Sequence, residues 1–135
     1  LAKKSIFPGG FFADVMKLDL GNTTLPTVSV CQAMKPEKME VKMLEAHQFT
    51  CEGLLPLDDD VAIFVGAPAD VMKLDAFLVP KGTFVRLNPY IIHGAQFALH
   101  EEEAHVLCLL PGRTFRNDME AVMLTEEERA VLVME

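Results

Sequence analysis

The chain has 135 residues, half of them apolar, and a net charge of −8 from 20 acidic against 12 basic side chains. This length suits a single domain over 1–135, because either half alone would bury too little surface to fold by itself. An acidic surface repels nucleic acid and anionic membranes, so we expect neither as a partner. No apolar run reaches the roughly 20 residues that a membrane-spanning helix needs.

Short apolar stretches with a period of two run through most of the chain, which is the pattern of β-strands. Turn residues separate them at fairly regular spacing, as in β-sandwiches and barrels. A continuous apolar run at 61–65 indicates a strand that is buried on both faces. In chain order, the expected strands are 11–20, 28–34, 39–45, 49–57, 61–65, 76–79, 84–87, 91–99, 104–110 and 117–124.

One short helix is expected near the C-terminal end. Thr125 can cap it, Glu128 stands at the capping-box position, and the acidic residues between them suit the positive end of the helix dipole. Apolar side chains at 130, 132 and 133 would pack it against the strands. Because no alternation of strands and helices is visible, a doubly wound parallel sheet is excluded and the fold class is all-β.

The three cysteines, Cys31, Cys51 and Cys108, are far apart in apolar stretches, and no Cys-x-x-Cys pair is present. Such spacing predicts neither a zinc site nor a redox site. We therefore expect buried thiols in a cytoplasmic protein. Two further histidines, His100 and His105, flank three glutamates, and this segment is typical of a solvated turn between two strands.

Four potential ligands stand out: Glu45, His47, Glu52 and His93. Residues two apart in a strand face the same side, so Glu45 and His47 should project together, and a barrel can bring His93 to them. Two carboxylates and two imidazoles can hold one divalent ion, such as Zn, Mn, Fe or Ni. A metal-free site is the alternative, with one histidine as base and one glutamate as proton donor or substrate anchor. Otherwise the four are hydrogen-bonded histidines and solvated acids.

The spacing of these residues resembles the cupin family. Glu45, His47 and Glu52 are similar to its first motif, with Glu45 where cupins usually have histidine. Residues 80–93, which end at His93, resemble its second motif, and Phe97 stands where that motif usually ends in Asn. The resemblance implies a cupin-type jelly-roll barrel, a double-stranded β-helix, with the site in its mouth.

Within the cupins, the chain resembles the ureidoglycolate lyase family, through the stretches 44–47, 52–56 and 92–97. This implies a C–N lyase that releases urea from ureidoglycolate and leaves glyoxylate. It also implies that His47 and His93 act as base and acid, and that Glu45 or Glu52 orients them or holds a metal.

The remaining roles concern substrate binding and assembly. Lys81, Arg86 or a metal could bind the substrate carboxylate, and Tyr90 could line the mouth as a hydrogen-bond donor. The resemblance further implies a homodimer, for which the apolar segment 6–12 is a possible contact. Two other functions remain open. One is a sugar- or metabolite-binding cupin or sugar isomerase, since carboxylates suit hydroxyl-rich ligands. The other is a non-catalytic barrel.

Overall fold

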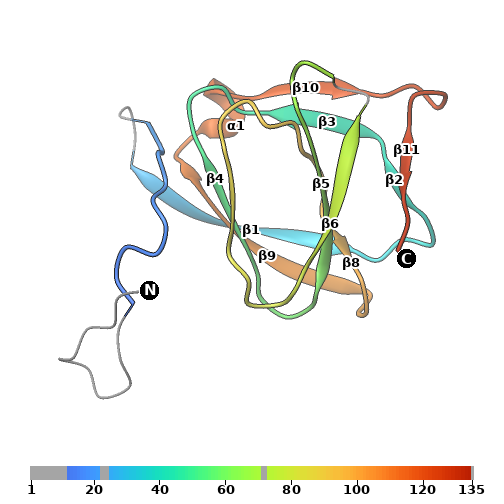
Figure 1. The fold of residues 1–135 in the computed structure, drawn as a ribbon, viewed down its shortest axis with the longest axis horizontal. Helices are drawn as coiled ribbons and strands as arrows, with labels where there is room; N and C mark the ends of the chain where they lie inside the picture. Colours follow the sequence, from blue (N-terminus) through green and yellow to red (C-terminus); the bar gives the residue numbers. More distant parts are fainter. Residues whose placement is uncertain (1–11, 22–24, 71–72, 135) are drawn as a thin grey trace.

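A computed structural model describes residues 12–21, 25–70 and 73–134 (Figure 1). The regular secondary structure of the described chain is almost entirely β-strand. Its elements are β1 (Pro26–Met34), β2 (Met39–Val41), β3 (Met43–Ala46), β4 (Glu52–Pro56), β5 (Val61–Gly66), β6 (Leu74–Val79), β7 (Val85–Leu87), β8 (Phe97–Ala98), β9 (Glu103–Pro111), α1 (Thr114–Asn117), β10 (Glu120–Met123) and β11 (Ala130–Leu132). No helix in these ranges is long and apolar enough to cross a membrane.

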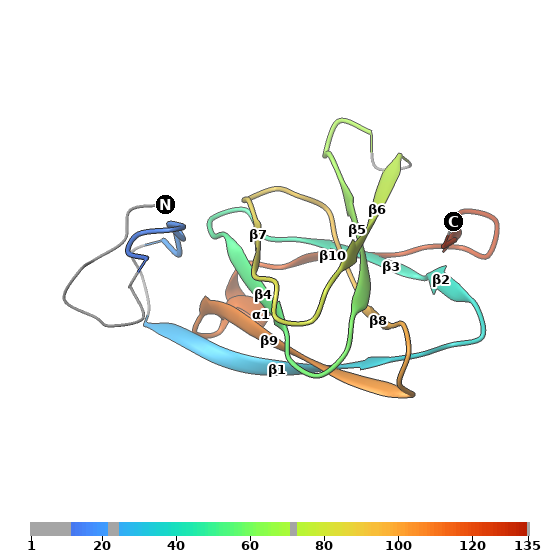
Figure 2. The ribbon, with the colours of Figure 1, turned by 60° about the horizontal axis from the view of Figure 1, so that its bottom comes forward.

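Seven strands form one sheet in the order β6-β5-β8-β1-β9-β4-β7, and this sheet curls into a nearly closed barrel. The pairs β10–β3 and β11–β2 form two further antiparallel sheets, which lie at the top and right of Figure 1. The long strands β1 and β9 run side by side along the opposite side, and the β5–β6 hairpin rises beyond the barrel (Figure 2). The architecture is the predicted all-β cupin type.

Strict alternation on β9 supplies the inner face of the barrel. Ala104, Val106, Cys108 and Leu110 are buried, while the residues between them are only half-buried. A period of two places alternate side chains on one face, so this strand turns a continuous apolar row inward. The row packs with inward residues of the neighbouring strands in the main core cluster.

Strand β5 is buried on both faces, as its continuous apolar run predicts. Val61 and Ile63 belong to the barrel core, whereas Ala62 and Phe64 belong to a second cluster that also contains Leu44 of β3. Burying one side chain of the size of Leu, Ile or Phe contributes about 1.5–3 kcal/mol. The second cluster therefore fixes β3, and with it the neighbouring ligand residues, against the barrel wall.

Two predicted elements are absent from the positions where they were expected. Residues 12–20 form no strand in the described part of the chain, because their alternation is broken by charged residues and Asp14 adopts a left-handed conformation (φ 54°). The one short helix lies at Thr114–Asn117 rather than from Thr125. Half of the predicted capping box forms: the Glu128 carboxylate accepts from the Thr125 N–H, but the Thr125 hydroxyl donates to the same carboxylate instead of accepting from the Glu128 N–H. Residues 126–128 make only a turn, and β11 follows.

The reason for the missing C-terminal helix is tertiary pairing. Ala130–Leu132 pair antiparallel with β2, and Leu132 is buried in the second cluster. Local capping signals are weak compared with such packing, because the free-energy cost of forming the first helical turn exceeds the stabilisation from its capping hydrogen bonds.

Three predicted strands have different bounds in the structure. Strand 39–45 is split into β2 and β3, and 91–99 keeps only β8 and two isolated bridges. Strand 117–124 begins only at Glu120, after α1.

Two smaller predictions concern the cysteines and the dimer contact. Cys51 and Cys108 are buried and Cys31 is half-buried, all three as free thiols. Burial raises the pKa of Cys108 to about 12, so this thiol is protonated and unreactive at neutral pH. The apolar segment 6–12 lies outside the described residues apart from the exposed Phe12.

Candidate metal centre

Glu45, His47 and Glu52 are placed by β3, the bend that follows it, and β4. Glu45 lies in β3, His47 immediately follows that strand, and Glu52 begins β4. The bend between the two strands is closed by the carboxylate of Asp118, which accepts hydrogen bonds from the main-chain N–H groups of Gln48 (2.8 Å) and Phe49 (2.9 Å). The chain therefore turns back at once, and His47 and Glu52 approach each other.

His93 reaches the same place from a distant part of the chain. Its backbone forms an isolated antiparallel bridge with Glu45, with N–O distances of 2.8 and 2.9 Å in the two directions. The next residue must be small, since a Cβ atom on Gly94 would lie 2.5 Å from the Phe64 ring and 2.8 Å from the main-chain oxygen of Met43. Gly94 thus lets the His93 segment lie directly against β3 and the second core cluster.

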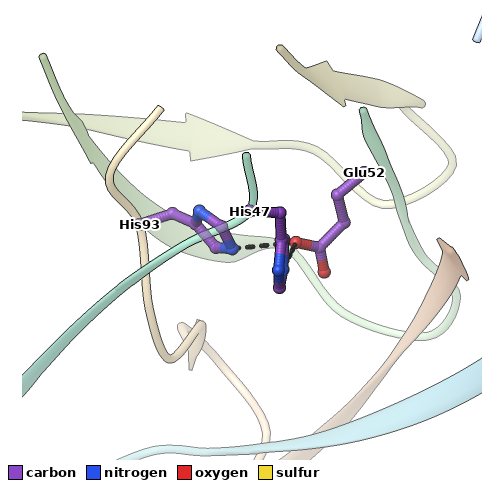
Figure 3. A group of neighbouring side chains, drawn as sticks. All are labelled: His47, Glu52 and His93. Atoms are coloured by element: carbon purple, nitrogen blue, oxygen red, sulfur yellow. Dashed lines mark ion pairs between the residues drawn. The ribbon is translucent and has the colours of Figure 1, made fainter. Parts of the chain in front are cut away.

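Three side chains converge in the barrel on one carboxylate oxygen (Figure 3). Oε2 of Glu52 lies 2.8 Å from Nε2 of His93 and 3.2 Å from Nε2 of His47. The two ring centroids are 5.1 Å apart. The three residues are only 3–5% exposed, and one ligand atom from each lies within 4.8 Å of the others. No other such group of three occurs among the described residues.

The proton on each ring is fixed by a main-chain carbonyl. Nδ1 of His47 lies 2.8 Å from the main-chain oxygen of Asp118, and Nδ1 of His93 lies 2.9 Å from that of Ile91. A carbonyl oxygen can only accept, so each Nδ1 carries a proton and donates it. In the neutral rings, both Nε2 lone pairs therefore point toward the Glu52 carboxylate. This is the arrangement found in metal-binding histidines, whose second nitrogen donates to a carbonyl or carboxylate.

Three electron-rich atoms meeting in a dry interior need a cation between them. A proton is one solution: burial lowers the pKa of both imidazoles, but the hydrogen bonds and charge of Glu52 outweigh it and raise the pKa of His47 and of His93. For Glu52 the signs are reversed: burial raises the pKa of its carboxyl, but the hydrogen bonds with the two rings lower that pKa to about 2. A divalent metal ion is the other solution, because two histidines and one carboxylate are a recurrent set in catalytic metal sites.

Glu45 stands at the boundary between this group and solvent. Its Oε1 is 3.7 Å from Nε2 of His93, and the residue is half-buried. Burial raises the pKa of its carboxyl, and the charge of Glu52 adds to this, although the two imidazoles oppose it. Glu45 also lines a cleft of about 310 Å³, together with Tyr90, Gln48, Glu120, Glu128 and a mainly apolar wall.

The predicted substrate-binding residues lie in different places. Tyr90 is half-exposed in the wall of the cleft, in a left-handed conformation (φ 69°), and its main-chain N–H donates to His47 O (2.7 Å). Lys81 is exposed in the turn before β7, beside the far end of β4, roughly 13 Å along the strand from Glu52.

Arg86 lies on the outer face of the barrel. It pairs with Gly53, whereas Glu52 pairs with Leu87, and neighbouring residues of a strand face opposite sides. Its guanidinium donates to the main-chain oxygen of Lys17 instead (3.0 Å). The structure therefore does not bring Lys81 or Arg86 to the buried group, and a role for either in substrate binding stays a prediction.

Two neighbours of the site were not anticipated from the sequence. Asp118 binds both the ring and the loop of His47, and the ring of Phe115 meets the His47 ring edge-on at a centroid distance of 6.1 Å. Both belong to the α1 region, about 70 residues beyond His47. The chain between 111 and 120 has no local pattern that points back to the histidine, so only the fold reveals these contacts.

Solved structures share this fold at low identity. CapF in complex with 3-isopropenyl-tropolone is 13% identical, with a TM-score of 0.59 over 77% of this chain and 30% of that one. FeII HppE is 14% identical, with a TM-score of 0.50 over 62% and 41%. Hydroxypropylphosphonic acid epoxidase from S. wedmorenis is 17% identical, with a TM-score of 0.46 over 63% and 41%. The chain thus spans less than half the length of these structures.

The sequence comparisons are more specific. No curated protein sequence matches the chain. The family profile described as ureidoglycolate lyase, however, matches residues 12–131 and so includes Glu45, His47, Glu52 and His93. Because this match extends over nearly the whole sequence, the chain belongs to the ureidoglycolate lyase family.

Proposed function

We propose that the chain is a C–N lyase that acts on ureidoglycolate or a closely similar ureido acid, at a centre that holds one divalent metal ion. The convergence of the Nε2 atoms of His47 and His93 on Oε2 of Glu52 supports this most strongly. Ligand atoms around one tetrahedral zinc ion lie roughly 3.3 Å apart, given Zn–N bonds of about 2.0–2.1 Å. Two of the three spacings, 2.8 and 3.2 Å, are close to that value, and one ligand atom from each residue lies within 4.8 Å of the others.

The reaction needs two proton transfers and no oxidant. A base takes the proton of the carbinol hydroxyl, the oxygen electrons form the new C=O bond, and the C–N bond breaks with its electron pair on nitrogen. An acid then protonates that nitrogen, so the products are glyoxylate and urea. A bound metal ion would contribute by stabilising the negative charge on the carbinol oxygen.

Metal binding divides the roles among the four site residues. Once both Nε2 atoms hold a metal, neither ring can exchange a proton, because each Nδ1 proton is engaged by a carbonyl. Proton transfer then falls to Glu45, which lies beside His93, lines the cleft and has a raised pKa. A carboxyl group at the edge of a buried site can accept a proton as a carboxylate and donate it as a carboxylic acid.

The surroundings also favour a metal for binding the substrate carboxylate. The described residues that line the cleft include Glu45, Glu120 and Glu128 but no Lys or Arg. An anionic substrate would be repelled from such a wall unless a cation lies at its end. With Lys81 and Arg86 elsewhere, the metal is the cation that the site can offer.

A neutral, hydroxyl-rich ligand such as a sugar is the second candidate. The same acidic wall favours it, because carboxylates accept several hydrogen bonds from hydroxyl groups and do not repel an uncharged molecule. A ligand-binding cupin or a sugar isomerase would then replace the lyase.

Metal content and turnover together test the proposal. The purified protein is analysed for bound metal, stripped, reloaded with Zn²⁺, Mn²⁺, Fe²⁺ or Ni²⁺, and assayed for urea and glyoxylate release from ureidoglycolate. We expect activity in at least one metal form and its loss in Glu52→Gln, which keeps the shape of the side chain and removes its charge. His105→Ala serves as the matched control, because this histidine is partly exposed near the start of β9, at the opposite end of β4 from Glu52.

A thermal-shift series separates the two candidates. Ureidoglycolate and glyoxylate should stabilise the metal-loaded protein, and neutral sugars should not. Stabilisation by sugars alone, without urea release in any metal form, would contradict the lyase and support the second candidate.

A further inference from the structure

We propose that Asp118 is the positioning residue of the metal centre: it holds the His47 ring through one hydrogen bond and the loop that follows His47 through two more. The inference rests on the proposed function for its consequence, but its geometry is independent of the reaction. Asp118 lies directly after α1, 71 residues beyond His47, and does not itself approach Glu52 or His93 in any described contact.

Asp118 accepts hydrogen bonds from the His47 loop through both its main-chain oxygen and its carboxylate. Its main-chain oxygen accepts the hydrogen bond from Nδ1 of His47 (2.8 Å). One carboxylate oxygen accepts from the main-chain N–H of Gln48 (2.8 Å), and the other accepts from that of Phe49 (2.9 Å). The carboxylate therefore fixes the backbone on which His47 sits, while the carbonyl fixes the rotation and the proton of its ring.

Asp118 is in turn anchored to the barrel wall. Its main-chain N–H donates to the oxygen of Thr114 (2.8 Å), and the buried Thr114 hydroxyl donates to the oxygen of Pro111, at the end of β9. The His47 loop is thus tied to β9 through a short chain of hydrogen bonds. Such outer contacts orient metal ligands, and their loss typically weakens metal binding by roughly 10- to 100-fold.

The two histidines differ in this respect. Nδ1 of His93 donates to Ile91, only two residues away in its own segment, whereas Nδ1 of His47 depends on a residue from another part of the fold. Removal of the Asp118 carboxylate keeps the main-chain oxygen that binds the ring, but it frees the loop at Gln48 and Phe49 that carries His47. The His47 ring should then be held less firmly, whereas the His93 ring stays in place. A general loosening of the barrel would affect both rings.

Asp19 provides a matched control within the same cavity. Asp19 and Asp118 both line a cavity of about 530 Å³. Asp19 also uses its main-chain oxygen, which accepts from Cys51 N–H, and its carboxylate, which accepts from Gly21 N–H. No described contact joins Asp19 to His47. Asp19→Ala thus removes the same charge from the same cavity without touching the ring.

The experiment compares the wild type with Asp118→Ala, Asp118→Asn and Asp19→Ala. Nitrogen-15 NMR of the histidine rings reports which nitrogen carries the proton, and titration with Zn²⁺ reports the affinity. In Asp118→Ala the main-chain acceptor remains but both carboxylate contacts with the loop are gone, so we expect the Nδ1–H signal of His47 to weaken, that of His93 to persist, and Zn²⁺ affinity to fall roughly 10- to 100-fold. Asp118→Asn retains one accepting oxygen and should lose roughly three- to tenfold. Asp19→Ala should bind Zn²⁺ within about twofold of the wild type.

An Asp118→Ala protein with an unchanged His47 signature and wild-type affinity would overturn the proposal. If that variant does not fold, the same unchanged result in Asp118→Asn would overturn it. A wild type that binds no metal would instead refute the metal centre, and the contrast between the His47 and His93 rings would still decide the role of Asp118.

Discussion

Two histidine–carboxylate groups lie at opposite ends of β4, and they differ in burial and convergence. At the start of the strand, His47 and His93 share one oxygen of Glu52 in the protein interior. Beyond its end, His105 lies between Asp58 (2.6 Å) and Glu103 (3.1 Å), each bound to a different ring nitrogen. The exposed group has satisfied pairs that point apart, whereas the buried group has three acceptors aimed at one point. Residue type alone does not make a metal site; shared direction and exclusion of water do.

Stability should show the largest difference between the two groups. In the metal-free protein at pH 6, Glu52→Leu leaves two buried imidazoles without their anion, and we expect a loss of about 3 kcal/mol in the free energy of unfolding. Asp58→Leu should cause no measurable loss, because solvent screens the exposed pair. Urea unfolding measures both. Equal losses in the free energy of unfolding would show that the buried Glu52 group stabilises the protein no more than the exposed Asp58 pair does.

Metal affinity should separate the groups in the same direction. His93→Ala removes one of three proposed ligands, so we expect Zn²⁺ affinity to fall by at least roughly 100-fold, more than for a residue that only orients a ligand. His105→Ala should leave the affinity unchanged. Isothermal titration calorimetry gives both values, and a His105→Ala variant that loses the metal would place the ion at the exposed turn.

The pH dependence of stability should change when metal is added. Glu52 has its pKa lowered from 4.5 to about 2, so its contribution is present above about pH 4.5 and is lost as the pH falls toward 2. His47 and His93 have pKa values raised above 6.5, so their contribution is complete below pH 6.5 and is lost as the pH rises through the raised values.

Bound metal replaces the protons that the two rings would otherwise carry. Zn²⁺ should therefore abolish the loss of stability above pH 6.5 and should bind more weakly as the pH falls. Thermal unfolding between pH 5 and 9, with and without Zn²⁺, tests this. If stability falls equally above pH 6.5 with and without Zn²⁺, the imidazoles do not coordinate the metal.

Salt should produce the smallest effect. The pKa of His105 is raised by its hydrogen bond with Asp58, which outweighs the opposing effect of burial, and this pair is exposed. Added salt screens surface charges, so proton NMR should show the pKa of His105 moving back toward 6.5 at 1 M NaCl. The rings of His47 and His93, buried with Glu52, should respond less. Equal responses would mean that water reaches the buried group.

The sequence predicts the barrel well because period-two patterns report directly on strands with one buried face. β5 is a clear case of the other pattern, a continuously apolar run that is buried on both faces. In β9 the sequence is apolar at every position from 106 to 110, and only the structure shows that alternate side chains face inward. Glu45, His47, Glu52 and His93 were recognised from their spacing and a family resemblance, and the structure brings them together. The helix expected from Thr125 shows the limit: Glu128 does accept from the Thr125 N–H, but pairing with β2 determines the conformation.

What sequence reasoning missed depends on contacts between distant segments. Asp118 has no local signal that relates it to His47, and Arg86 cannot be assigned to the outer face without its register opposite Gly53. Likewise, the role of Gly94 follows only from the approach of Phe64 and β3. Such information lies in the packing of the barrel rather than in any stretch of the chain.

The central claim is that His47, Glu52 and His93 bind one metal ion, and X-ray absorption at the zinc edge tests it most directly. For protein loaded with one equivalent of Zn²⁺, the account predicts two imidazole nitrogens at about 2.0–2.1 Å with oxygen in the remaining positions. It also predicts a single imidazole in His93→Ala. A zinc shell without imidazole, or one that His93→Ala leaves unchanged, would contradict it.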